Sequence, residues 1–283
     1  MIELPVRHFA GLLPALRALP INHLFARAVL ERCVDGRVWV DDAMKPALVH
    51  VIHPYGMTLL FGDAAAVAPQ TLSRHLNEAA RGPNDRWMQV FPVNHGRRVA
   101  ELLQAEIADA STPPGGLKAQ QYTRANFRFE AERFASSDFP RHLPAGMSLR
   151  PMSESDFSLP GMSVSPNCFW NDAAQFLRNG GGWCLAQGDE VAAMAFSSFR
   201  FDDDLEIGVE TRLTFRRRGL AQLAAAKLIE TCLAQGLQAL WSCRKENRAS
   251  YRLAQRLGFV PAAEIPYFRL PGRPSSSSNS ESS

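Results

Sequence analysis

The feature that most constrains this chain is a predicted β-strand that leads through an arginine-rich turn directly into a long predicted helix. Residues 205–211 (LEIGVET) alternate apolar side chains with polar or small ones, which is the pattern of a strand with one buried face. The turn carries three consecutive arginines followed by Gly219. A largely apolar segment then runs from 220 to 234, and Gly236 follows it, as expected where a helix ends. The segment therefore predicts an α/β unit.

The turn between this strand and helix is suited to binding a phosphate group. The first backbone N–H groups of a helix have no intrahelical partner and carry a partial positive charge, so they can hold an anion. Gly219 allows a ligand to approach the backbone closely, and the arginines add positive charge. A basic turn before a helix is, by itself, more often solvated charge. The neighbouring segments favour the other interpretation, and the predicted ligand group is a pyrophosphate.

Two motifs in this half of the chain resemble those of the GNAT superfamily of N-acetyltransferases. Residues 205–221 (LEIGVETRLTFRRRGLA) match a strand, a loop of the form Arg/Gln-x-x-Gly-x-Gly/Ala and a long helix. A second motif follows at the corresponding distance, with LWSC at 240–243, NRAS at 247–250 and LGF at 257–259. The resemblance implies a mixed α/β sheet of the GNAT acyl-CoA N-acyltransferase fold, with acetyl-CoA as co-substrate and an amine as acceptor.

The chain is also similar to a narrower group, the zwittermicin-resistance-like GNAT acetyltransferases. The shared patterns are Glu-Ile-Gly-x-x-Thr, aromatic-Arg-x-x-Gly-Leu-Ala and Asn-x-x-Ser-x-x-Leu-Ala, and GRVWVDD at 36–42 resembles the group's N-terminal half. This implies a small-molecule, antibiotic-like amine as the acceptor. Polyamines, amino acids, aminoacyl groups and protein amines remain open, because the shape of the pocket sets that choice and the motif does not.

The resemblance carries over, residue by residue, to a predicted acetyl-CoA site. It implies that the loop and the helix start bind the pyrophosphate, while the strand end and the second motif bind the pantetheine arm. The implied cofactor-binding residues are Val209, Thr211, Arg216, Arg217, Arg218, Gly219, Leu220, Ala221, Asn247 and Ser250. Asn247 is equally well explained as a helix N-cap, and the two roles are compatible.

Amine acetylation requires a group that accepts a proton from the amine. The alternation along the strand places Glu206 and Glu210 on one face. Glu206 lies where many GNAT members carry a general base, so the resemblance implies this role for Glu206, with Glu210 as the substitute candidate. The alternative for Glu206 is an exposed or ion-paired strand glutamate. Many GNAT members carry a tyrosine acid where this chain has Ala254, and Tyr251 lies about 300° around the helix from it. No acid is assigned, and a catalytically weak or inactive CoA-binding regulatory or interaction module remains the alternative function.

The 283 residues suffice for two domains. We predict an N-terminal α/β domain at 1–135, for which a degenerate GNAT-like domain is one interpretation, and the catalytic GNAT domain at 146–271. A serine-rich tail at 272–283 is predicted to be disordered. Predicted helices cover 8–33 as a pair, 72–80, 95–108, 171–178, 220–234 and 248–257, and predicted strands cover 37–40, 47–53, 57–61, 87–93, 147–152, 182–187, 191–199, 205–211, 240–243 and 265–270.

Composition excludes several other classes of protein. The net charge of +3 and the scattered basic residues do not indicate a nucleic-acid surface. The five cysteines are odd in number, without a CxxC pair, so reduced thiols and no metal are expected. No apolar run approaches the length needed to span a membrane, so we expect a cytoplasmic protein. We expect it to be a monomer or a homodimer. Phe169, Trp170 and Asn171 are candidates for the acceptor pocket, with a core aromatic anchor as the alternative.

Overall fold

The computed structural model describes residues 1–272, which form two compact units. Unit 1 contains residues 1–9, 36–123 and the chain from 265 onward, and unit 2 contains residues 10–35 and 124–264. Each unit therefore combines segments from both sides of the boundary predicted between 135 and 146. The predicted disorder of the tail concerns residues that lie, apart from Gly272, outside the described part of the chain.

Unit 1 is built on a mixed sheet with the strand order β1-β2-β3-β4-β5-β13. All neighbours are antiparallel except β4 and β5, whose parallel pairing runs from Met57↔Trp87 to Phe61↔Phe91. Its elements are β1 (Ile2–Glu3), β2 (Arg37–Val40), β3 (Leu48–Ile52), β4 (Met57–Gly62), η2 (Ala64–Ala66), α3 (Pro69–Arg74), the π-helical η3 (His75–Ala79), β5 (Arg86–Phe91), η4 (Val93–His95), α4 (Gly96–Leu103), β6 (Glu106–Ile107), the start of β7 (Gln120–Phe129) and the end of β13 (Phe259–Leu270).

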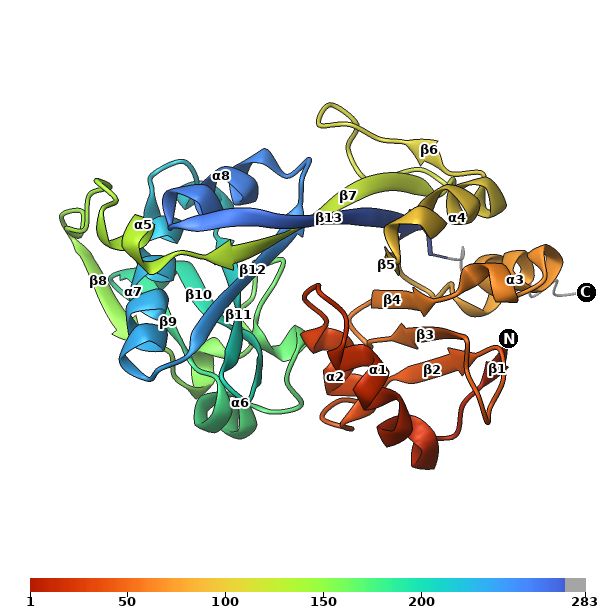
Figure 1. Ribbon diagram of the computed structural model, residues 1–283. Helices are drawn as coiled ribbons and strands as arrows, with labels where there is room; N and C mark the ends of the chain where they lie inside the picture. The colour runs from red at the N-terminus through yellow and green to blue at the C-terminus, as the bar shows by residue number, and fades with distance from the viewer. Residues whose placement is uncertain (273–283) are drawn as a thin grey trace, which may run out of the picture. The chain divides into compact units, whose positions relative to one another are not determined.

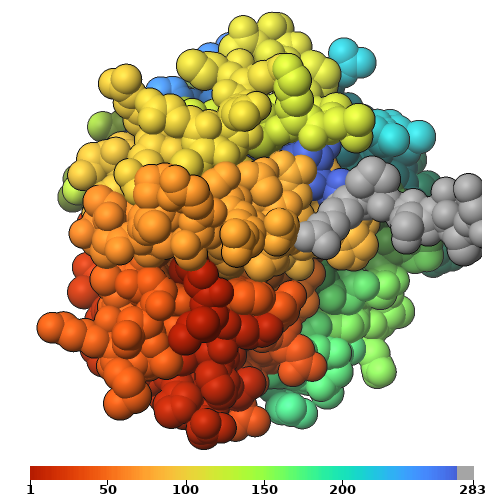
Figure 2. All heavy atoms as spheres, turned by 90° about the vertical axis from the view of Figure 1, so that its right-hand side faces the viewer, coloured from red at the N-terminus to blue at the C-terminus, as the bar shows by residue number. Residues whose placement is uncertain are grey.

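The helices of unit 1 pack on one face of its sheet. Leu72 and Leu76 from α3 and η3, with Val99 and Leu103 from α4, share one buried cluster with strand residues such as Leu60. Figure 2 shows unit 1 from the side of these helices, in orange to yellow. The helix predicted at 95–108 is shorter than expected, because Gln104 adopts a left-handed conformation (φ 50°) that ends α4 before β6.

The strands of unit 2 also form a mixed sheet, with the order β13-β7-β12-β11-β10-β9-β8 (Figure 1). In unit 2, β11 and β12 are the parallel neighbours, and the other pairs from β7 to β8 are antiparallel. Its elements are α1 (Leu13–Arg17), α2 (Leu24–Leu30), the end of β7, α5 (Ala131–Ala135), β8 (Met147–Pro151), η5 (Glu154–Asp156), η6 (Pro166–Cys168), α6 (Ala173–Asn179), β9 (Gly182–Gln187), β10 (Glu190–Phe201), β11 (Asp204–Thr211), η7 (Leu213–Phe215), α7 (Leu220–Ala234), β12 (Gln238–Arg244), α8 (Arg248–Arg256) and the start of β13; the 3-10 helix η1 (Val6–Leu12) runs from unit 1 into unit 2.

The core of unit 2 lies between one face of this sheet and the helices α7, α8 and α5. Leu205 and Ile207 of β11, with Trp241 of β12, face this core, so the even-numbered residues of β11 face the opposite side. Strand β7 was not predicted, although residues 123–129 alternate apolar and polar side chains. This strand supplies two residues of the site described below. The mixed α/β fold class predicted from the sequence is confirmed.

Candidate functional site

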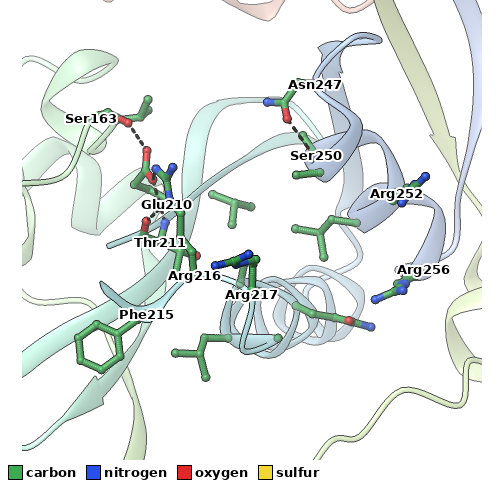
Figure 3. A pocket seen from close by; sticks show the side chains of 18 of the residues that line it. Ser163, Glu210, Thr211, Phe215, Arg216, Arg217, Asn247, Ser250, Arg252 and Arg256 are labelled. Atoms are coloured by element: carbon green, nitrogen blue, oxygen red, sulfur yellow. Dashed lines mark hydrogen bonds and ion pairs between the residues drawn. The ribbon is translucent and has the colours of Figure 1, made fainter. Parts of the chain in front are cut away.

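The central feature of unit 2 is an opening between two parallel strands that separate. Strands β11 and β12 pair from Asp204↔Gln238 to Glu206↔Leu240 only. Beyond Glu206, β11 remains paired with β10, while β12 remains paired with β7 on its other side. The strands therefore diverge, and a cavity of about 680 Å³ opens between Val209 of β11 and Trp241 of β12 (Figure 3).

The cavity brings together the cofactor-binding residues predicted from the two motifs, with one exception. The predicted residues that line it are Val209, Thr211, Arg216, Arg217, Gly219, Leu220, Ala221, Asn247 and Ser250. Arg218 is not among the lining residues, and its guanidinium lies over the ring of Phe215, 5.4 Å from the ring centroid. Sequence reasoning missed Ser163, Gln222, Trp241, Arg252 and Arg256, which also line the cavity. Arg252 and Arg256 are four residues apart on α8, and this spacing was the one sequence signal that they share a face of the helix.

The loop before α7 presents a series of backbone N–H groups to this cavity. In the described part of the chain, the N–H groups of residues 217–221 make no backbone hydrogen bond. Arg217 (φ 63°) and Gly219 (φ 77°) are both left-handed, and alternation of this kind turns successive amides toward one point, where an anion can bind. A Cβ at Gly219 would have no atom within 4 Å, so this position borders open space. The loop and the helix start fit a pyrophosphate.

The Glu210 carboxylate stabilises this loop through hydrogen bonds and an ion pair. It accepts hydrogen bonds from Arg216 (3.1 Å), from the Thr211 N–H (3.0 Å) and from the Ser163 hydroxyl. The ion pair with Arg216 links the end of β11 to the first residue of the loop motif. Glu210 and Glu206 share a face of β11, as the alternation predicted, but the two carboxylates have different surroundings.

Glu206 lies where β11 and β12 begin to separate, and only 6% of it is exposed. Burial raises the pKa of its carboxyl group, against the opposing effects of the nearby Arg124 guanidinium and of a hydrogen bond from Asn22. The Arg124 Nη2 atom lies 3.6 Å from Glu206 Oε1. Glu206 Oε2 is buried and has no hydrogen-bond partner among the described residues. This carboxylate therefore has a free acceptor atom and a raised proton affinity.

A small polar network surrounds Glu206 on this face of the sheet. Asn22, between α1 and α2, donates from its backbone to Asn126 Oδ1 and from its side chain to Ser242 Oγ, both at 3.0 Å. Asn126 Nδ2 is buried, and no described residue accepts a hydrogen bond from it. Arg124 and Asn126 come from β7. Sequence reasoning missed the network because these residues lie far from the motifs along the chain.

The second motif places its residues along the other side of the cavity. Asn247 caps α8 by accepting a hydrogen bond from the Ser250 N–H at 3.3 Å, and Trp241 Nε1 donates to Ser250 Oγ at 3.3 Å. The N-cap role predicted for Asn247 is thus present. Ala254 is fully buried, and Tyr251 packs against Phe127 with ring centroids 5.1 Å apart. Neither residue lines the cavity.

The three residues considered for the acceptor pocket lie elsewhere in unit 2. Phe169 and Trp170 line a hollow of about 130 Å³ together with Cys33 and Phe201. Trp170 Nε1 donates to the Ser197 carbonyl at 2.7 Å, and Asn171 donates to the Cys33 carbonyl at 2.7 Å. These contacts are those of a packed aromatic anchor.

Residues 1–272 hold neither a cluster of side chains suited to a metal ion nor a helix suited to cross a membrane. The described residues contain no group of three or more His, Cys, Asp or Glu side chains placed to hold a metal ion. The helices within this range are too short or too polar to cross a membrane.

Comparison with known proteins agrees with this geometry. Residues 18–268 match the family model described as GNAT acetyltransferase. The chain belongs to the GNAT acetyltransferase family. The GNAT resemblance seen in the two motifs is thereby confirmed, and acyl transfer is the chemistry of this family.

Individual GNAT relatives cover most of the chain. An uncharacterized N-acetyltransferase, YdfB, from Bacillus subtilis (strain 168) is 25% identical over 244 residues, which are 85% of this chain and 87% of the relative. A GCN5-related N-acetyltransferase-like protein from Streptococcus suis 89/1591 superposes with a TM-score of 0.67 at 19% identity, covering 93% of this chain and 99% of the other. A tandem GNAT protein from the clavulanic acid biosynthesis pathway superposes with a TM-score of 0.59 at 14% identity, covering 97% and 98%.

Proposed function

We propose that this GNAT protein is an acetyl-CoA-dependent N-acetyltransferase that acetylates an amine of a small molecule. The observation that carries the proposal is the cavity between β11 and β12, which has unpaired amides at one end. The buried Glu206 carboxylate is outside its lining and lies at the point where the two strands separate. The amides of residues 217–221 would hold the pyrophosphate with the Arg217 guanidinium beside them, while Arg216, paired with Glu210, shapes the loop. The unpaired edge of β11 at Val209 and Thr211 would hydrogen-bond to the pantetheine arm, with Asn247 and Ser250 on the facing side.

In this proposal the thioester lies at the separation point of the strands, near Glu206. The amine nitrogen attacks the thioester carbonyl carbon, the C–N bond forms, the C–S bond breaks, and the sulfur leaves as CoA thiolate. The amine proton passes to Glu206, directly or through a water molecule bound at the free Oε2. Burial raises the pKa of Glu206, which makes its carboxylate a better proton acceptor than an exposed glutamate. No residue is assigned as the acid for the thiolate.

The acceptor is proposed by resemblance to the zwittermicin-resistance-like group, in which it is an antibiotic-like amine. Arg124, Asn22, Asn126 and Ser242 surround Glu206 with polar groups, and such groups suit an acceptor that carries hydroxyl and amino substituents.

We also propose that unit 1 is a degenerate GNAT-like unit without a CoA site. Its order β3-β4-α3-β5-α4 repeats the order β10-β11-α7-β12-α8 of unit 2, including a parallel strand pair joined through a helix. However, β4 and β5 stay paired over five successive positions, and Pro69 takes the first position of α3. Neither a strand opening nor an arginine-glycine loop is present there in the described residues.

Calorimetric titration with acetyl-CoA tests the cofactor site. Gly219→Glu places a carboxylate where the pyrophosphate binds, so we expect binding to be lost. Gly236→Glu is the matched control, because Gly236 is also left-handed (φ 69°), borders open space and lies beyond the other end of α7. Equal binding by wild type and Gly219→Glu, or none by wild type, would refute the site.

The alternative function is a CoA-binding regulatory or interaction module that has lost catalysis, favoured by Ala254 at the usual tyrosine position. Acetyl transfer to a panel of aminopolyols, polyamines and amino acids, followed by mass spectrometry, separates the two functions. Transfer that falls at least about 100-fold in Glu206→Gln, with acetyl-CoA affinity unchanged, supports the enzyme. Tight acetyl-CoA binding without transfer to any amine supports the module.

A further inference from the structure

The cavity between β11 and β12 carries more positive charge than its loop requires. Four arginines line it, and the one acidic residue of its lining, Glu210, is already paired with Arg216. Within residues 1–272, the other three, Arg217, Arg252 and Arg256, make no ion pair. A cavity lined by unneutralised guanidinium groups is suited to a ligand with several negative charges.

These three arginines lie on two different elements. Arg217 belongs to the loop before α7, whereas Arg252 and Arg256 are four residues apart on α8 and so share one face of that helix. Figure 3 shows Arg217 on one side of the pocket and the two α8 arginines on the other. A pyrophosphate held by the loop amides uses Arg217 and leaves the α8 pair for a separate anionic group.

A second cavity continues from this side. Arg256 and Gln222 line both the 680 Å³ cavity and a neighbouring one of about 560 Å³, which Arg133 and Asp138 also line. Arg133 is paired with Glu130 at 2.5 Å. Arg256 is therefore the cation at which the two cavities meet, and a ligand bound at the loop has room to extend past the first turn of α7.

We propose that Arg252 and Arg256 form a second phosphate site, which binds the 3′-phosphate on the ribose of CoA and makes the protein select CoA over 3′-dephospho-CoA. This inference rests on the proposed function. A phosphomonoester carries close to two negative charges near neutral pH and three strong acceptor oxygens. A guanidinium group binds two such oxygens at once through two parallel N–H···O hydrogen bonds.

Calorimetric titration with CoA and with 3′-dephospho-CoA tests this site. We expect wild type to bind CoA about tenfold more tightly, a difference of about 1.4 kcal/mol. In Arg252→Ala/Arg256→Ala the preference falls to about twofold or less, because CoA binds more weakly while 3′-dephospho-CoA is unaffected. Arg248→Ala is the matched control, an exposed arginine on the same helix that does not line the cavity, and it keeps the wild-type preference.

The possible failures are distinguishable. Equal affinity of wild type for the two ligands overturns the 3′-phosphate site and leaves the acetyl-CoA site standing. An equal loss for both ligands in the double variant also overturns it, because the arginines then act on a part common to the two ligands. No binding of either ligand by wild type refutes the proposed function, and this inference with it. Thermal unfolding of each variant checks that both substitutions leave the fold intact.

Discussion

The buried pair of Arg124 and Glu206 predicts a large effect on stability. The two side chains are only 11% and 7% exposed, with Nη2 and Oε1 3.6 Å apart. Two unit charges at this separation attract by about 4.6 kcal/mol at an effective dielectric constant of about 20. Removing one member of a buried pair costs about 3–5 kcal/mol, because the remaining charge stays buried without a counter-ion. We expect Arg124→Met to lower the free energy of unfolding by about 3 kcal/mol at pH 8.

The effect of Arg124→Met depends on pH in a defined direction. Burial raises the pKa of Glu206, and loss of the Arg124 charge raises it further. A carboxyl group whose pKa is higher in the folded state destabilises that state when ionised, and this cost disappears as the pH falls and the group is protonated. The difference in unfolding free energy between wild type and variant is therefore largest at pH 8 and shrinks toward pH 5.

Guanidinium chloride unfolding at pH 8, 6.5 and 5 measures this difference. The control is the same substitution in the Glu206→Gln background, where no carboxylate is left uncompensated and Arg124→Met should cost clearly less. A cost that is independent of pH, or equal in the two backgrounds, would show that Arg124 acts through packing alone and would refute the ion-pair argument.

Two further predictions concern other parts of the fold. His50 Nδ1 and His75 Nε2 are 2.8 Å apart in the core of unit 1, and burial holds the pKa of His75 at about 4 and that of His50 well below its usual value. Both histidines are neutral when folded and take up protons on unfolding, so the unfolding free energy falls by about 3 kcal/mol for His75 between about pH 6.5 and 4. In urea unfolding, the double variant His50→Gln/His75→Gln should lose less stability over this pH range than wild type. Gly258→Ala would place a Cβ 2.7 Å from the Phe134 backbone nitrogen at φ 84°, whereas the Cβ of Gly236→Ala, at φ 69°, meets no atom within 4 Å. Thermal unfolding should therefore show that the free energy of unfolding falls by about 3 kcal/mol in Gly258→Ala and by about 1 kcal/mol in Gly236→Ala. Equal losses in the two variants would contradict the close contact at Gly258.

The loop side of the cavity could be predicted from the sequence because that side is local. Residues 205–221 form a continuous strand, loop and helix start, and the unpaired amides of such a segment follow from the helix itself. The second motif added Asn247 and Ser250, and these two residues line one cavity together with residues of the strand end, the loop and the helix start. Arg218 was predicted to bind the cofactor but does not line the cavity, since the order of residues within a loop does not determine which side chains face inward.

The opposite side of the site was decided by tertiary structure. Asn22 hydrogen-bonds to Asn126, 104 residues away, and to Ser242, 220 residues away. Which side chains reach Glu206 depends on the pairing of β7 with β12 and on the placement of the α1–α2 segment, both of which result from burial over the whole unit. The opening itself depends on where the pairing of β11 and β12 stops. Helix starts and strand alternation are properties of neighbouring residues, whereas strand register and buried charge pairs are properties of the packed chain.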